Sequence, residues 1–170
     1  MNRIGLEAAG LALALLASPA SAQQGEPIGS WWLIATPGPS GHTIMTLSTQ
    51  GSGVVAFRCE GAHVTVLLGL NRPQTRRGAG IEAPSPAGAP VVVEWQVGAG
   101  PRTRAGGVAV EETVELDEAA SERIVAEAAE APSFTFHLAP GAAEEVTLVF
   151  RPVETRDAVA RLRAACAKGG

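Results

Sequence analysis

The sequence predicts a mainly β protein, an antiparallel β-sandwich or open barrel of about eight strands with one surface helix and a C-terminal helix. Short runs in which apolar and polar residues alternate recur along the chain, as half-buried strands require. Turn-forming residues separate these runs, with 20 Gly and 12 Pro among 170 residues. Hydrophobic residues make up 46% of the chain and charged residues 18%, so a single domain can bury a substantial core.

The first half of the chain is predicted to form an antiparallel meander. Its four strand candidates are bounded by Gly, Pro and Ser turns: Trp31–Thr36, Thr43–Ser48, Val54–Cys59 and His63–Leu70. The tight turn at Glu60 and Gly61 predicts a hairpin between the last two. Asn71–Pro90 follows as the longest irregular stretch.

The second half is predicted to add two hairpins. Val91–Val97 alternates and places Trp95 on an apolar face, and the chain returns over Val108–Leu116 with Val108 turned inward. Gly98–Gly107 is the predicted turn between these strands. In the third hairpin, the apolar faces consist of Phe134, Phe136 and Leu138 in one strand and of Val146, Leu148 and Phe150 in the other.

Two segments have the pattern of helices. Asp117–Glu130 begins with a residue able to cap the first turn and is stopped by Pro132, and its thin apolar stripe predicts a surface helix. Glu154–Ala167 places Val159, Leu162 and Cys166 on one face.

The N-terminus has the features of a secretory signal peptide over residues 1–22. Arg3 precedes the apolar run Ala8–Ala17, and Ala20-Ser21-Ala22 matches a small-x-small cleavage site. A membrane anchor is the alternative, but the apolar run is shorter than the roughly 20 residues that a span needs. We therefore expect a flexible leader over 23–30, a single β-rich domain over 31–168, and a periplasmic or secreted location without a membrane span in the mature form.

The chain has two cysteines, Cys59 and Cys166. An even number of cysteines in an exported protein predicts a disulfide, with two free buried thiols as the alternative. The disulfide would tether the C-terminal helix to the strand that ends at Cys59. A redox-catalytic role is disfavoured because the chain has no C-x-x-C motif.

No catalytic motif, cofactor site or metal site is evident, so the sequence does not predict an enzyme. The three His, at positions 42, 63 and 137, lie in no recognisable motif, and His137 is expected on a solvent-exposed strand face. Ser40 near His42 lacks the G-x-S-x-G pattern. A hydrolase of unfamiliar type, using His42 or His137 with a neighbouring Ser, remains the alternative.

The charge pattern indicates which classes of partner the protein could attract. A formal net charge of −4 gives no general attraction for nucleic acid. Arginines in two predicted loops are candidates for a local positive, partner-binding surface, with ordinary solvated loop charge as the alternative: Arg72, Arg76 and Arg77 in one loop, and Arg102 and Arg104 in the other.

The layout of the chain resembles that of the VasI-like small exported proteins of Gram-negative bacteria, a group that includes type VI secretion-associated and related periplasmic proteins. The shared features are an export signal, an early Trp31, a strand ending in Cys59, a mid-chain strand with Trp95, and a final helix ending at Cys166. The resemblance implies a periplasmic binding or accessory role with an envelope protein as partner, and it implies no catalytic residue.

Overall fold

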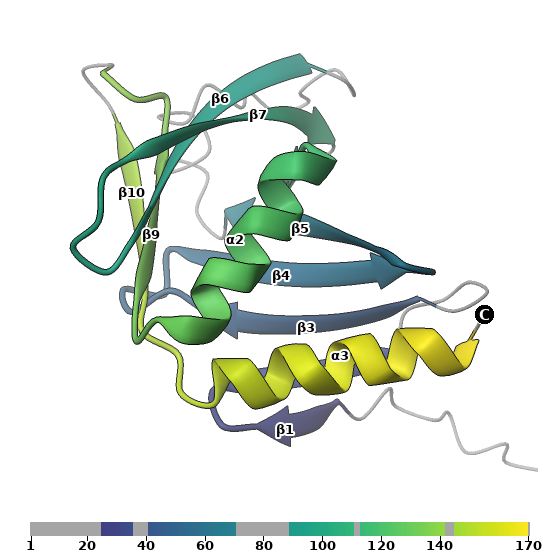
Figure 1. Ribbon diagram of the computed structural model, residues 1–170. Coiled ribbons are helices and arrows are strands. Elements are labelled where there is room, and N and C mark those ends of the chain that lie inside the picture. The colour runs from purple at the N-terminus through teal and green to yellow at the C-terminus, as the bar shows by residue number, and fades with distance from the viewer. Residues whose placement is uncertain (1–24, 36–40, 71–88, 111–112, 142–144, 170) are drawn as a thin grey trace, which may run out of the picture.

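The described parts of the chain form one open, antiparallel sheet of ten strands with two helices (Figure 1). The computed structural model describes residues 25–35, 41–70, 89–110, 113–141 and 145–169. The strands are β1 Glu26–Ile28, β2 Trp31–Ala35, β3 His42–Leu47, β4 Gly53–Glu60, β5 His63–Leu70, β6 Ala89–Val97, β7 Thr103–Val110, β8 Thr113–Leu116, β9 Phe134–Leu138 and β10 Val146–Phe150. The helices are α2 Glu118–Glu130 and α3 Thr155–Gly169.

The sheet has the strand order β1-β2-β3-β4-β5-β8-β7-β6-β9-β10. It curls, so that β9 and β10 run steeply across the direction of β3 and β4 (Figure 1). The backbone N–H of Thr49, just after β3, donates a 2.8 Å hydrogen bond to the carbonyl oxygen of Val149 in β10. Gly53 suits this crossing, because a Cβ there would lie 3.0 Å from the methyl groups of Leu148 and from the carbonyl oxygen of Gly69.

Aromatic side chains fill the interior of the curled sheet. The rings of Phe57 in β4 and Phe134 in β9 lie 6.5 Å apart, and the ring of Trp31 lies 5.0 Å from that of Phe57. The Trp31 indole N–H donates to the Thr155 hydroxyl, at 3.2 Å, and so joins β2 to the start of α3. The alternation of apolar residues in β4 and β9 thus creates a core between the two ends of one sheet.

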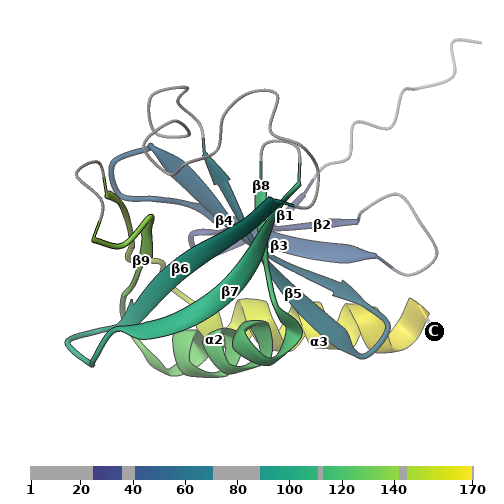
Figure 2. The ribbon, with the colours of Figure 1, turned by 90° about the horizontal axis from the view of Figure 1, so that it is seen from above.

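Both helices lie on the same side of the sheet, below the strands in Figure 2. Asp117 caps α2 by accepting a 2.7 Å hydrogen bond from the N–H of Ala120, and Ile124 is among the residues that α2 buries. In α3, the buried side chains include Leu162 and Cys166. Neither helix in the described parts of the chain is long and apolar enough to cross a membrane.

The mainly β antiparallel class, both helices and the third predicted hairpin are confirmed. In the second predicted hairpin, β6 pairs with the following strand as expected, but β7 begins at Thr103, within the segment Gly98–Gly107 that the sequence predicts as the turn. The sheet has ten strands rather than about eight, and one of the two unpredicted strands lies in the leader. Glu26–Ile28 forms β1, with Ile28 buried and paired with Trp31 across a turn at Gly29, whose φ is +57°. The part of the leader that the structure describes is therefore ordered in the sheet.

The segment 108–116 is not one strand, as the sequence predicted. β7 ends at Val110, and β8 then pairs with both β7 and β5, which joins the two halves of the sheet. Val108 is 40% exposed rather than turned inward, while Ala105 and Ala109 are buried. Small residues face the core here because Val114 and Leu116 of β8 pack closely against β7.

Candidate functional site

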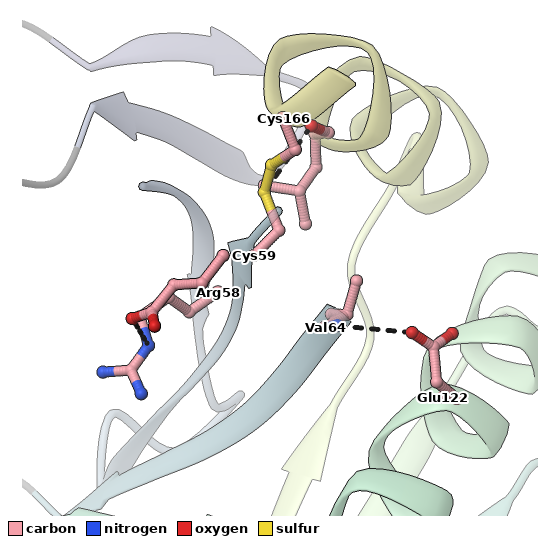
Figure 3. The surroundings of a disulfide bond; sticks show 7 residues. Arg58, Cys59, Val64, Glu122 and Cys166 are labelled. Atoms are coloured by element: carbon pink, nitrogen blue, oxygen red, sulfur yellow. Dashed lines mark hydrogen bonds and ion pairs between the residues drawn. A yellow bond between two sulfur atoms is a disulfide. The ribbon is translucent and has the colours of Figure 1, made fainter. Parts of the chain in front are cut away.

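A disulfide between Cys59 in β4 and Cys166 in α3 joins the sheet to the C-terminal helix (Figure 3). Cys59 is paired in register with His42 of β3 and Val64 of β5. The Cα atoms of the two cysteines are 6.3 Å apart, within the range that a disulfide spans. Both cysteines are buried, so the link ties the last turns of α3 to the core.

A cleft of about 550 Å³ opens beside the disulfide, between the β4–β5 turn, α2 and α3. Most of its lining consists of small side chains: Cys59, Gly61, Ala62, Val64, Cys166 and Ala167. Its volume lies within the range of about 300–1,000 Å³ that is typical of small-molecule sites.

The edge of β5 explains how α2 is held at this cleft. β8 pairs only with Leu67, Leu68 and Gly69, and so leaves the first half of the β5 edge without a neighbouring strand. Two side chains of α2 accept the backbone N–H groups there. Ser121 accepts from Val66 at 3.0 Å, and Glu122 accepts from Val64 at 3.2 Å, the contact drawn in Figure 3. The Glu122 carboxylate is therefore fixed by the backbone of β5.

Glu122 and Arg163 are the charged groups of the cleft lining. The second carboxylate oxygen of Glu122 lies 3.5 Å from Nη2 of Arg163, with side-chain exposures of 41% and 54%. This contact joins α2 to α3 across the cleft. Sequence reasoning missed both residues, because each lies on a polar helix face and only the packing of the two helices brings them together.

The predicted positive surface is only partly within the described structure. Arg102, just before β7, and Arg104, in β7, belong to one ion-pair cluster. Arg104 Nε lies 3.2 Å from Glu94 of β6, and Arg102 Nη1 lies 3.7 Å from Glu94 and 3.3 Å from Glu145. Neither arginine is an unpaired positive charge. Arg72, Arg76 and Arg77 lie outside the described residues.

His137 is next to this cluster and is 5% exposed, rather than on a solvent-exposed face. Its Nδ1 lies 2.9 Å from the Glu145 carboxylate and 3.3 Å from the Thr147 hydroxyl. A nucleophilic triad needs its nucleophile and its carboxylate on opposite nitrogens of the imidazole, but here both groups contact Nδ1. The buried Nε2 has no hydrogen-bond partner among the described residues. Ser40, the neighbour of His42, lies outside them.

The surroundings of Glu145 predict a pH-dependent contribution to stability. The backbone N–H of Gly141, the His137 hydrogen bond and the Arg102 charge lower the pKa of Glu145 below 4.5, against the opposing effect of desolvation. A group whose pKa is lower in the folded state than in the unfolded state stabilises the fold at pH values above its unfolded-state pKa. This stabilisation is lost as the pH falls through the folded-state pKa. We expect the melting temperature of the Glu145→Gln variant to approach that of the wild type as the pH is lowered from about 6 to about 3. A difference between them that stays constant over this range would contradict the prediction.

Comparison of the chain with protein-family models, curated proteins and solved structures finds no match. Within the described ranges, no group of three or more His, Cys, Asp or Glu side chains is placed to hold a metal ion. The site is therefore interpreted from its own geometry.

Proposed function

We propose that the protein is an exported binding or accessory protein of the bacterial cell envelope, periplasmic or secreted, with an envelope protein as partner. The observation that carries the proposal is the cleft beside the Cys59–Cys166 disulfide. The signal-peptide pattern of residues 1–22 and the resemblance to the VasI-like proteins support the location and the accessory role.

The construction of the cleft supports binding. Its walls are two helices and a strand turn rather than long loops, and rigid elements hold a recognition surface more precisely than loops do. The disulfide fixes α3, and the Ser121 and Glu122 hydrogen bonds fix α2. A cleft that exists before the ligand arrives spares the partner the entropy cost of ordering it.

In-cell photo-crosslinking tests the proposal. A benzophenone side chain is placed at Ala62, which is exposed at the cleft, and at Ala99 in the β6–β7 turn as the matched control. We expect position 62, and not position 99, to form a covalent adduct with an envelope protein in the native bacterium. Recovery of exported protein in quantity with no adduct at position 62, or with the same adduct at both positions, would contradict the proposal.

Export itself has a direct test. We expect mass spectrometry of the protein recovered from the periplasm or the medium to show an N-terminus at Gln23. A full-length chain that stays in the cytoplasm would overturn the proposed location.

A further inference from the structure

We infer that the cleft binds an aliphatic carboxylic acid, with the hydrocarbon chain against the small residues beside the disulfide and the carboxylate on Arg163. This inference rests on the proposed binding function and adds a small-molecule ligand at the same site, beside the envelope protein proposed as partner. It follows from the shape of the apolar part of the cleft and from the polar contacts of its two charged residues, because within the described part of the chain Glu122 has two such contacts and Arg163 has one.

The apolar part suits a narrow hydrocarbon chain. Ala62, Val64 and Ala167 line it together with Gly61 and the disulfide, and none of these groups is larger than Val. Small lining residues keep the space open, whereas Leu or Phe side chains would fill it. Burial of a hydrocarbon chain among such groups removes apolar surface from water.

The polar part favours an anion. One oxygen of Glu122 accepts from the Val64 backbone and the other lies near Arg163, so the hydrogen bond to β5 holds this carboxylate in place. The Arg163 guanidinium carries five N–H donors, and among the described residues its only polar contact is the one to Glu122. That contact, at 3.5 Å, is longer than the roughly 2.7–2.9 Å of a strong charge-assisted hydrogen bond.

Arg163 therefore has donors available for a second carboxylate, which it can bind through two parallel hydrogen bonds. Glu122 would repel the incoming carboxylate and compete with it for Arg163. The two members of one ion pair are thus expected to affect binding in opposite directions, which a purely structural salt bridge would not do.

The test measures the binding of octanoate to the mature, oxidised protein by isothermal titration calorimetry. Octan-1-ol, which lacks the carboxylate, and acetate, which lacks the chain, are the ligand controls. We expect octanoate to bind at least about tenfold more tightly than octan-1-ol, because one charge-assisted hydrogen bond accounts for roughly that factor. Octanoate should also bind more tightly than acetate, because acetate has no hydrocarbon chain to bury in the cleft.

Variants assign the binding to the cleft. Arg163→Gln should weaken octanoate binding by about tenfold or more, and Glu122→Gln, which keeps an oxygen for the Val64 N–H, should strengthen it. Arg161→Gln is the matched control, since Arg161 lies on the same helix but contacts Glu26 instead. Ala62→Phe should fill the cleft and abolish binding, and circular dichroism confirms that each variant is folded.

Each outcome decides the inference. The inference would be overturned if Arg163→Gln and Arg161→Gln affected octanoate binding equally. It would also be overturned if Glu122→Gln weakened octanoate binding, or if acetate bound as tightly as octanoate. If octanoate does not bind while the crosslink from position 62 persists, the ligand class is wrong and the proposed function stands. If octanoate does not bind and position 62 gives no crosslink, both proposals fail.

Discussion

Replacing Phe134 by Ala should lower the free energy of unfolding by about 3–5 kcal/mol, the usual cost of removing a buried aromatic side chain from a close-packed core. Phe134 is 1% exposed and lies where the two ends of the sheet meet. Its ring is stacked 5.3 Å from Phe150, meets Phe136 edge-on at 5.9 Å and lies 6.5 Å from Phe57. The substitution would therefore leave a cavity and remove three ring contacts at once.

Denaturant unfolding followed by Trp fluorescence measures this loss. Trp32→Ala is the matched control, because Trp32 is also an aromatic strand residue but is 52% exposed. Because Trp32 is 52% exposed, its removal takes away much less buried apolar area and should cost clearly less than the Phe134 substitution. Similar losses for the two variants would mean that the interior does not depend on the aromatic cluster.

The elements that the sequence predicts are those whose signals are local. Strict alternation marks β6 and β9, and Asp117 with Pro132 brackets α2. β1 gives no such signal, because it has three residues and its one buried side chain, Ile28, depends on pairing with Trp31. The division of this part of the chain into β7 and β8 is also non-local, since β8 is defined by its pairing with β5 and β7 on either side.

In the candidate site, too, the features with a local signal in the sequence could be predicted and the others could not. The cysteines follow from their number and from the apolar stripe of the last helix, so their pairing could be anticipated. Glu122 and Arg163 are 41 residues apart on two helices, and their meeting depends on how α2 covers the free edge of β5. The alternation of β9 correctly put His137 on the face opposite Phe136, but the expected solvent exposure was wrong. The Glu145 carboxylate, ion-paired with Arg102, lies beside the imidazole, and alternation alone does not reveal that.

The site and the stability of the fold depend on the same covalent link. The disulfide closes a loop with a sequence separation of 107, and it holds α3 beside the cleft. α3 has 15 residues, a length at which an isolated helix is marginal in water. Reduction should therefore release the last turns of α3 before it unfolds the sheet, and Arg163 and Ala167 would leave the cleft with them.

The double variant Cys59→Ala with Cys166→Ala should accordingly lose about 2–5 kcal/mol of unfolding free energy, the usual cost of removing a native disulfide from a small domain. Ala is chosen because both cysteines are buried, and a Ser hydroxyl would require a hydrogen-bond partner there. Denaturant unfolding measures the loss, and reduced wild type should match the variant.

The oxidised protein should gain two hydrogens in mass on reduction, and only then should both thiols alkylate. Wild type that alkylates before reduction, or a double variant of full stability, would show that the link does not hold α3.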